Sequence, residues 1–316
     1  MNGVDMDELT KAIDEELMRG IPPRKGRLPG PFRWIGGKGL LVPWLLHHLP
    51  PRERVGVYVE PYAGAANLLF ALPEPYPVEV LNDLDKRIAN LYRVLQDPTL
   101  FRELAHRLLW TPYAREEFVR ALEVLERWDE HTSVERAWAF FVAQNQGFGG
   151  VAETQGRWGR VFTSRGNQAE TTSRWSSRLA SLVSWHQRLL RVQIDSRDAL
   201  EVIRYWDSPE TFFYVDPPYW GKSVYYEVGE GDGHHEALVD LLLEVRGMVL
   251  LSGYDAPPYR RLEEAGWWRK EKRTSAYSAG RIRGSDLRGA GSAREKVARV
   301  EVLWGNYPLE NSALLL

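Results

Sequence analysis

Cysteine is absent from this chain of 316 residues. Its absence excludes disulfide bridges, zinc or iron–sulfur sites held by thiolates, and catalysis by a cysteine nucleophile. Hydrophobic residues make up 44% of the sequence and charged residues 27%. Both fractions are close to the averages for globular proteins, so wholesale disorder is excluded as well.

Long apolar segments are also lacking. The apolar run 40–49 is far shorter than the roughly 20 residues that cross a bilayer as a helix. The acidic N-terminus has none of the apolar core of a secretory signal. We therefore expect a cytoplasmic protein with no membrane partner.

Neither sign of charge is in large excess, because the net charge is −2. The charges are nevertheless segregated along the chain. Residues 24–38 hold five cations and no acid, and residues 270–299 hold nine cations against three acids. Basic surface could therefore gather on one face, as in nucleic-acid-binding proteins, although scattered solvated charge is the alternative. We expect 270–299 to be a mobile loop near the active site or near any nucleic acid that binds, with plain disorder as the alternative.

Short apolar runs alternate with helix-like segments along much of the chain. The expected strands are 55–59, 78–81, 211–215 and 248–251. Strands that alternate with helices predict an α/β fold with an open, mostly parallel sheet, in which ligands bind beyond the carboxyl ends of the strands. Helical patterns such as 116–127 and 134–143 dominate the middle of the chain. We expect a flexible lead-in over 1–30, a sheet domain over 31–95 plus 193–316, and an inserted, mainly helical domain over 96–192.

The most informative local motif is Asp216-Pro217-Pro218-Tyr219, which follows an apolar strand. An exocyclic amine of a nucleobase is a poor nucleophile because its lone pair is conjugated with the ring. Asp216 and the backbone carbonyl of Pro217 could accept hydrogen bonds from such an amine, while Tyr219 could stack on a base taken out of its duplex. The alternative is an ordinary proline-containing turn after a strand.

A second motif, Glu60-Pro61-Tyr62-Ala63-Gly64, follows an earlier strand. Small residues after a strand let a ligand approach the backbone closely, although a tight strand-to-helix turn explains them equally well. Asp83 comes 19 residues after Gly64 at the end of the next strand. At that spacing an acid can meet ribose hydroxyls, and Asp85 is the competing candidate.

A third motif is Phe32-Arg33-Trp34-Ile35-Gly36-Gly37-Lys38. It lacks the residues of a phosphate-binding loop, because Phe32 and Gly39 stand where Gly and Ser or Thr are needed. Lys38 could instead neutralise a carboxylate or approach Asp216, and Trp34 could pack on a cofactor. The alternative is a turn with a surface lysine.

Taken in order, the segments 32–38, 60–64, 82–83 and 216–219 resemble the motifs of the Dam-type (D12 class) DNA adenine methyltransferases. The stretch 139–150 is similar to the F-F-x-x-N-x-x-G-F-x-G signature of that family. The motif order is similar to that of the α group of amino-methyltransferases. The resemblance implies a Rossmann-like S-adenosylmethionine-dependent methyltransferase sheet with an inserted target-recognition domain.

The resemblance also implies functions for individual residues. The implied cofactor-binding residues are Trp34, Gly37, Lys38, Glu60, Tyr62, Gly64, Asp83 and Asp216. The implied catalytic residues are Asp216, Pro217 and Tyr219. Base contacts cannot be transferred from the family, because 147–177 lacks its N-x-P-x-G continuation. From residue type alone, the expected DNA contacts in the inserted domain are Asn145, Phe148, Arg157, Arg160 and Arg165. One departure stands out: the family often has G-x-G where this chain has Gly64-Ala65-Ala66.

The expected function is site-specific methylation of the N6 amine of a flipped adenine in double-stranded DNA, with S-adenosylmethionine as the methyl donor and no metal. The lack of cysteine is consistent with this, because methylation of a cytosine ring carbon needs a thiolate. A partner restriction endonuclease and a prokaryotic or phage source are further expectations. Methylation of cytosine N4, of RNA or of protein glutamine, and a silent DNA-binding protein, remain as alternatives; Asp216 favours DNA adenine.

Overall fold

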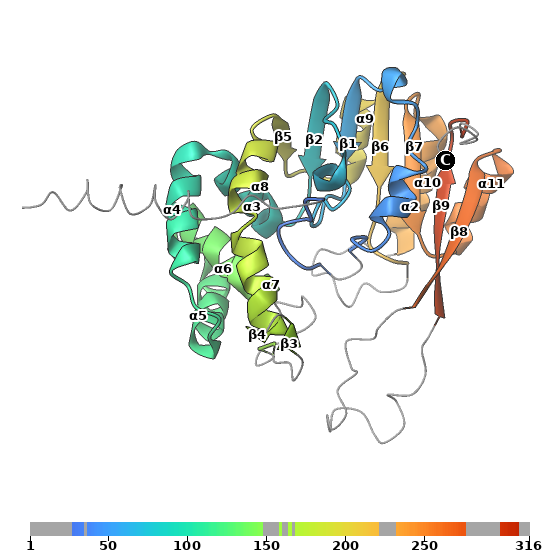
Figure 1. The fold of residues 1–316 in the computed structure, drawn as a ribbon. Coiled ribbons are helices and arrows are strands. Elements are labelled where there is room, and N and C mark those ends of the chain that lie inside the picture. The colour runs from blue at the N-terminus through green and yellow to red at the C-terminus, as the bar shows by residue number, and fades with distance from the viewer. Residues whose placement is uncertain are drawn as a thin grey trace, which may run out of the picture. The chain divides into compact units, whose positions relative to one another are not determined.

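A computed structural model describes residues 27–34, 37–147, 158–159, 164–165, 168–220, 232–275 and 298–309. The chain divides into two compact units (Figure 1). Unit 1 comprises Met1–Val42, Ala65–Pro73 and Lys86–Val192. Unit 2 comprises Pro43–Gly64, Glu74–Asp85 and Gln193–Leu316.

A seven-stranded sheet, drawn almost entirely from unit 2, has the strand order β5-β2-β1-β6-β7-β9-β8. Strands β1, β2, β6 and β7 pair in parallel, whereas β9 is antiparallel to both β7 and β8. The strands are β1 (Val57–Glu60), β2 (Val78–Asn82), β5 (Val192–Asp195), β6 (Thr211–Val215), β7 (Met248–Gly253), β8 (Trp268–Ser275) and β9 (Ala298–Gly305). The predicted α/β, Rossmann-like sheet is confirmed, and the four expected strands are all present.

The order of the strands creates a switch point between β1 and β6. From β1 the chain builds β2 on one side, and later returns to place β6 on the other side. Loops at such a switch point diverge and leave room for a ligand beyond the carboxyl ends of the strands. The loops that follow β1 and β6 hold two of the predicted motifs.

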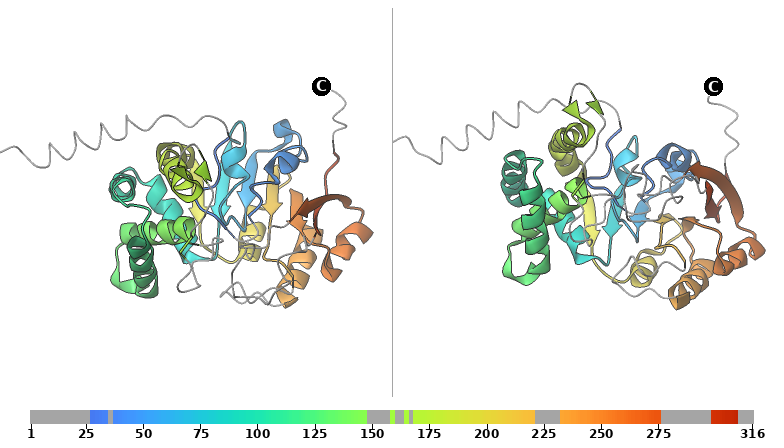
Figure 2. Two further views of the ribbon diagram at one scale, coloured as in Figure 1. Left: turned by 60° about the horizontal axis from the view of Figure 1, so that its bottom comes forward. Right: turned by 90° about the horizontal axis from the view of Figure 1, so that it is seen from below.

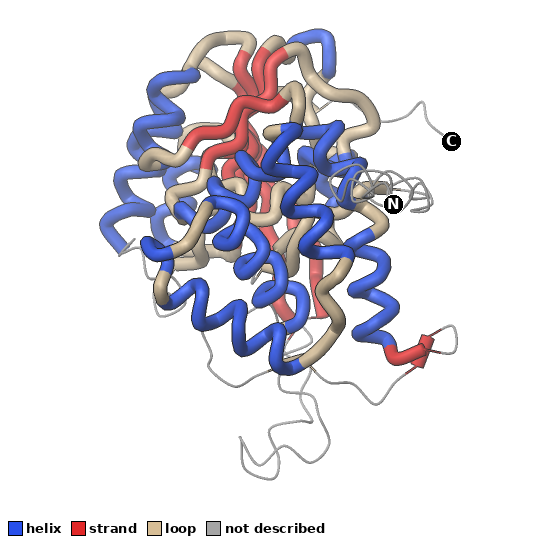
Figure 3. Tube along the Cα trace, turned by 90° about the vertical axis from the view of Figure 1, so that its left-hand side faces the viewer, coloured by secondary structure: helices blue, strands red, loops and turns tan. Residues whose placement is uncertain are grey.

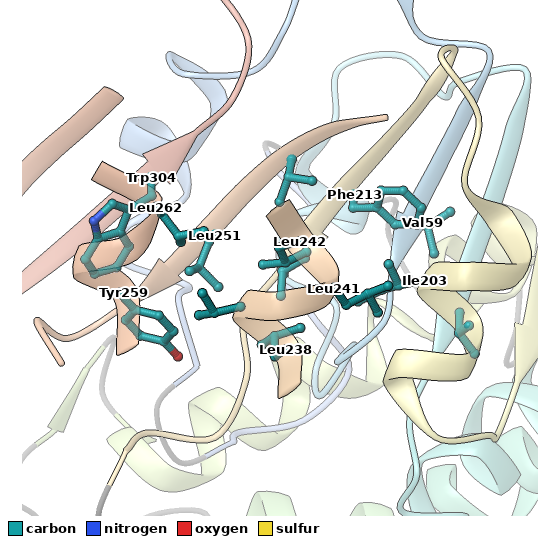
Figure 4. Packing of buried hydrophobic residues seen from close by; sticks show 14 of the residues in the cluster. Val59, Ile203, Phe213, Leu238, Leu241, Leu242, Leu251, Tyr259, Leu262 and Trp304 are labelled. Carbon is teal, nitrogen blue, oxygen red and sulfur yellow. The ribbon is translucent and has the colours of Figure 1, made fainter. Parts of the chain in front are cut away.

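One face of the sheet is covered by α9 (Ala199–Trp206), α10 (Asp232–Glu244) and α11 (Arg260–Glu264). Figure 4 shows this core, in which Val59 and Phe213 of the sheet pack with Ile203 and Leu238 of the helices. Because side chains alternate along a strand, the neighbours of these core residues project from the opposite face. Tyr58 and Phe212 lie on that second face, with their rings in contact.

Shorter elements complete unit 2. They are η1 (Arg52–Arg54), η6 (Pro257–Tyr259) and the helix α2 (Val42–Leu46), whose first residue belongs to unit 1. The apolar run 40–49 therefore forms a helix of five residues only. The basic stretch expected to be a loop from residue 270 begins instead as strand β8 and ends in β9, because these segments pair with each other over eight residues. Residues 276–297 lie outside the described residues.

Unit 1 is mainly helical, as predicted for the middle of the chain, and Figure 3 shows its helices packed side by side. The helices are α3 (Lys86–Gln96), α4 (Pro98–Leu109), α5 (Arg115–Glu126), α6 (Ser133–Gln146), α7 (Glu170–Leu179) and α8 (Leu182–Leu189), with short 3-10 turns η2 (Leu69–Ala71) and η3 (Trp128–Glu130). A capping box starts α6: the Thr132 hydroxyl accepts from the Glu135 N–H and the Glu135 carboxylate accepts from the Thr132 N–H. Strands β3 (Ser164–Arg165) and β4 (Gln168–Ala169) pair antiparallel, and β4 leads directly into α7 (Figure 2).

Candidate active site at the carboxyl edge of the sheet

The predicted site residues of unit 2 come together at one edge of the sheet. Strands β1, β2, β6 and β7 are parallel, so their carboxyl ends share that edge. Seven predicted residues lie in or directly after three of these strands: Glu60, Tyr62, Gly64, Asp83, Asp216, Pro217 and Tyr219. Trp34, Gly37, Lys38 and Asn145 belong to unit 1.

Asp83 connects the loops that follow β1 and β2. Its Oδ2 accepts a hydrogen bond of 2.8 Å from the Gly64 N–H, and its Oδ1 accepts one of 2.9 Å from the Asp85 N–H. A carboxylate oxygen can accept more than one hydrogen bond, so ribose hydroxyls can be received while these two bonds persist. Asp85, the competing candidate, supports Asp83 through its backbone.

The loop after β1 contains two residues in the left-handed region of backbone conformation. Gly64 and Ala66 both have a φ of 47°. Glycine adopts this conformation freely, whereas alanine is strained in it. The departure from G-x-G noted in the sequence therefore places an alanine where the backbone favours glycine.

Asn82 is a residue that the sequence analysis gave no function. Its Nδ2 donates to the Pro61 carbonyl at 2.8 Å and to the Arg197 carbonyl at 3.0 Å, and its Oδ1 accepts from the Arg197 N–H at 2.9 Å. The buried Asn82 side chain thus joins the loops that follow β1 and β5. The feature of the sequence that could have identified Asn82 is its position directly after a predicted strand.

Glu60 lies on the second face of the sheet and is buried. Its Oε1 accepts a hydrogen bond of 2.6 Å from the Tyr58 hydroxyl. Burial, together with the negative charge of Glu60, raises the pKa of Tyr58 well above its ordinary value. Tyr58 therefore remains a neutral donor that fixes the carboxylate at the end of β1.

Tyr62 lies against the start of α10. Its hydroxyl is 2.7 Å from Nε2 of His234, and the two rings meet edge to face. Burial lowers the pKa of His234, so its ring is neutral near pH 7. A neutral ring nitrogen can accept a hydrogen bond from the Tyr62 hydroxyl. No pattern in the sequence indicated this contact between Tyr62 and His234.

Asp216 follows β6 at the switch point and is partly exposed. Its Oδ1 lies 3.5 Å from the hydroxyl of Ser252 on the neighbouring strand β7, and the same hydroxyl lies 3.3 Å from Oε1 of Glu301 on β9. Pro217, next in the loop, is buried. Ser252 and Glu301 were not predicted as site residues.

The ring of Tyr219 already has one aromatic neighbour. Tyr254, which follows β7, stacks on it with ring centroids 4.1 Å apart and planes 8° from parallel. One face of Tyr219 is therefore covered by protein, and a base that stacked on Tyr219 would use its other face.

In unit 1, a hydrogen bond joins Trp34 and Gly37, two of the predicted cofactor-binding residues. The Gly37 N–H donates to the Trp34 carbonyl at 3.0 Å, and a side chain at Gly37 would press against that carbonyl. Trp34 packs edge to face on Phe32. Lys38 is only 5% exposed, so it is not the surface lysine of the alternative interpretation.

Arg33 ties this motif to the end of α6. Its guanidinium donates to the carbonyl of Asn145 at 2.9 Å and to that of Gly147 at 2.6 Å. Burial lowers the pKa of Arg33 from its very high ordinary value, a change that leaves the guanidinium charged near pH 7. Asn145, a predicted DNA contact, donates its side-chain amide to the carbonyls of Pro31 and Phe141. Segment 32–38 of the family resemblance and the described part of segment 139–150 are thus joined inside unit 1.

Of the other predicted DNA contacts, only Arg165 belongs to the part of the chain that the structure describes. Phe148, Arg157 and Arg160 lie outside the described residues, and Arg165 is described only as part of strand β3. Among the residues that the structure describes, no group of three or more His, Asp or Glu side chains is placed to hold a metal ion. Within the same residues, no helix is long and apolar enough to cross a membrane.

A family model described as D12 class N6 adenine-specific DNA methyltransferase matches residues 34–275. No curated protein matches the chain. The matched segment is well over half of the chain and contains the candidate residues from Trp34 to Tyr219 as well as Ser252 and Tyr254. The family expected from the sequence is confirmed, and with it the methyl donor. The chain belongs to the D12 class N6 adenine-specific DNA methyltransferases, enzymes that transfer the methyl group of S-adenosylmethionine to adenine in DNA.

Proposed function

We propose that Asp216 and the backbone carbonyl of Pro217 activate the N6 amine of the target adenine. The observation that carries this proposal is the position of Asp216, which follows the central parallel strand β6 at the switch point of the sheet. Pro217 is buried and restricts the backbone of the loop. A carboxylate and a carbonyl so held lose little further entropy when a substrate binds.

Methyl transfer requires the lone pair on N6 of adenine, which is conjugated with the ring, to become available for bonding. By accepting the two N6 hydrogens, Asp216 and Pro217 would shift electron density back onto nitrogen. S-adenosylmethionine supplies, when bound, a methyl group on a positively charged sulfonium. Once the amine had taken up the methyl group, it would release one N6 proton, which the Asp216 carboxylate is placed to accept. Positioning of the amine is the main task left to the protein.

The cofactor is proposed to bind over the loops after β1 and β2. Asp83 would accept the ribose hydroxyls, and the loop that carries Glu60, Tyr62 and Gly64 would lie beside the rest of the molecule. The donor set fits this group, since Asp83 is held by two backbone N–H groups that fix its orientation. The parts assigned to Trp34, Gly37 and Lys38 in cofactor binding rest on the family motif.

Tyr219 is proposed to support the flipped adenine. A ring that is already stacked on Tyr254 is held in place before the base arrives. Base–aromatic stacking is worth about 1–3 kcal/mol per base. This is enough to offset part of the cost of unstacking a base from its duplex.

Recognition of the DNA sequence is proposed to fall to the inserted segment 96–192, with 31–95 plus 193–316 as the catalytic domain. The segment is helical and its later part is rich in arginine. Asn145, Phe148, Arg157, Arg160 and Arg165 are the proposed DNA contacts; phosphate contact is the commoner use of an arginine. Because Nδ2 of Asn145 already donates to the backbone of unit 1, a base contact that keeps these bonds would use Oδ1 as an acceptor.

We also propose a setting for the activity: the cytoplasm of a prokaryote or of a phage-infected cell, with a restriction endonuclease of the same sequence specificity as partner. The support for this setting is that the family acts on DNA. Genomic DNA methylated by the enzyme would then resist that endonuclease, and unmethylated DNA would not.

The direct test uses purified full-length protein, methyl-labelled S-adenosylmethionine and unmethylated genomic DNA. After digestion to nucleosides, label should appear in N6-methyladenine and should vanish with Asp216→Ala. Label in cytosine, or only in RNA or protein, would contradict the assignment of the substrate. Label that persists with Asp216→Ala would contradict the part given to Asp216. No observation on the described residues favours a silent DNA-binding protein.

A further inference from the structure

The loop after β1 is attached to two different elements of unit 2. Its backbone is bonded to the end of β2, where the Pro61 carbonyl accepts from Nδ2 of Asn82 at 2.8 Å and the Ala63 N–H donates to the Asn82 carbonyl at 2.8 Å. Tyr62, which lies between Pro61 and Ala63, directs its hydroxyl to α10, 2.7 Å from Nε2 of His234. The Tyr62 side chain therefore gives the loop a second attachment, to a helix that is distant in sequence.

Helix α10 is a firm support for this attachment. Leu238 of the helix packs in the core with side chains of β6 and β7 (Figure 4). His235, the neighbour of His234, is 2% exposed, and its Nδ1 lies 2.8 Å from the Tyr259 hydroxyl. Because the core fixes the beginning of α10, a hydrogen bond to His234 restrains Tyr62 more than it restrains the helix.

The chemistry of the pair suits a persistent hydrogen bond near neutral pH. Burial lowers the pKa of His234, although the charge of Asp198 acts in the opposite direction. In the neutral ring one nitrogen accepts and the other donates. The Tyr62 hydroxyl can donate to Nε2 or accept from it, so the bond forms with either tautomer of the ring.

We propose that His234 is a positioning residue for S-adenosylmethionine, because it holds Tyr62 and with it the loop after β1. A loop that is ordered before the cofactor arrives loses less conformational entropy on binding, and its affinity is higher as a result. The inference rests on the proposed binding of the cofactor over the loops after β1 and β2. It adds to that site a residue from the helix that follows the catalytic loop.

The test measures the Kd for S-adenosylmethionine by isothermal titration calorimetry on variants of the full-length protein. Tyr62→Phe removes only the hydroxyl, and His234→Leu removes both ring nitrogens. Each change is expected to raise the Kd about 3- to 10-fold, the usual contribution of one hydrogen bond.

The double variant shows whether the two residues act through their contact. If they do, Tyr62→Phe combined with His234→Leu binds the cofactor no more weakly than the weaker single variant, because the second change has no bond left to remove. His234→Gln places an amide, which can accept or donate, near the position of Nε2. It should restore the Kd to within about twofold of the wild type.

The matched control is Tyr259→Phe. It removes the hydroxyl of the other tyrosine–histidine pair of α10, while the core packing that holds the helix remains. The Kd of Tyr259→Phe should equal that of the wild type. A Kd as high as that of Tyr62→Phe would assign the effect to the position of the helix and overturn the inference.

Three further results would overturn it: a wild-type Kd for Tyr62→Phe or for His234→Leu, single effects that multiply in the double variant, or a Kd for His234→Gln as high as that for His234→Leu. If His234→Leu does not fold, Tyr62→Phe and Tyr259→Phe still decide the matter. Asp83→Asn separates this failure from that of the proposed function. If Asp83→Asn weakens binding and Tyr62→Phe does not, only the inference about His234 fails; if neither weakens binding, the proposed use of Asp83 fails as well.

Discussion

The backbone N–H of Gly64 donates a hydrogen bond of 2.8 Å to the carboxylate of Asp83, joining the first two loops at the carboxyl edge of the sheet. The spacing of these residues in the sequence predicted a shared ligand, and the structure adds a direct contact between them. Because the loop after β1 depends on this carboxylate, its removal should affect both loop order and cofactor affinity.

Asp83→Asn should therefore weaken binding of S-adenosylmethionine. A hydrogen bond to a charged group is worth about 1.5–3 kcal/mol, so the Kd should rise about 10- to 100-fold. Isothermal titration calorimetry measures this directly. Asp85→Asn is the control, because Asp85 holds Asp83 through its main chain. A weaker Kd for Asp85→Asn with an unchanged Kd for Asp83→Asn would transfer the assignment to Asp85.

The strained alanine gives a prediction about stability. Ala65 and Ala66 are both buried, but only Ala66 has a positive φ. Replacing either by glycine removes one methyl group and adds the same freedom to the unfolded chain. Ala66→Gly also relieves backbone strain, so it should be more stable than Ala65→Gly by about 1–2 kcal/mol. Urea unfolding of the two variants measures the difference. Equal stabilities would show that Ala66 is not strained.

Stacking of Tyr254 on Tyr219 predicts an effect on base flipping. Tyr254→Ala removes an aromatic pair worth about 0.5–1.5 kcal/mol, so the affinity for a flipped base should fall about 2- to 10-fold. Fluorescence of 2-aminopurine at the target position reports the flipped state. Tyr254→Phe keeps the ring and should behave as the wild type; a loss as large as that of Tyr254→Ala would assign the effect to the hydroxyl instead.

A buried histidine should make the stability of unit 2 depend on pH. Burial is the main cause that lowers the pKa of His48, and the nearby charges of His47, Lys270 and Lys272 act in the same direction. The folded protein then binds a proton less readily than the unfolded chain. Stability is fully present above the ordinary histidine pKa of about 6.5 and is lost as the pH falls below it.

Thermal unfolding between about pH 7.5 and about pH 5 tests this linkage. The Tm of the wild type should fall with pH more steeply than that of His48→Gln, which has no proton to bind. Parallel curves for the two proteins would show that His48 does not contribute.

Much of the catalytic sheet could be predicted because its central strands are apolar runs that end in polar loops. Residues 211–215 were predicted as a strand and form β6 over the same residues. The edge strand β8 could not be found in this way. Its sequence, Trp268 to Ser275, is mostly charged and polar, and it becomes a strand by pairing with β9. An edge strand that carries lysine and arginine is a common guard against aggregation.

The residues of the candidate site also fall into two groups: those that the sequence indicated and those that only the structure reveals. Asp83 and Asp216 could be identified because each stands in a loop directly after a predicted strand. Ser252 and Glu301 meet Asp216 only once the order β6-β7-β9 and its register are known. Local sequence carries no record of that order, so long-range pairing of strands has to be seen in the structure.

The most direct test of the account is a single-turnover measurement with Asp216→Ala. The variant should flip the target base, yet at saturating S-adenosylmethionine its methyl-transfer rate should fall at least about 100-fold, as when one stabilising group is removed from other active sites. A methyl-transfer rate equal to that of the wild type, with label still in N6-methyladenine, would contradict the central claim that Asp216 activates the amine.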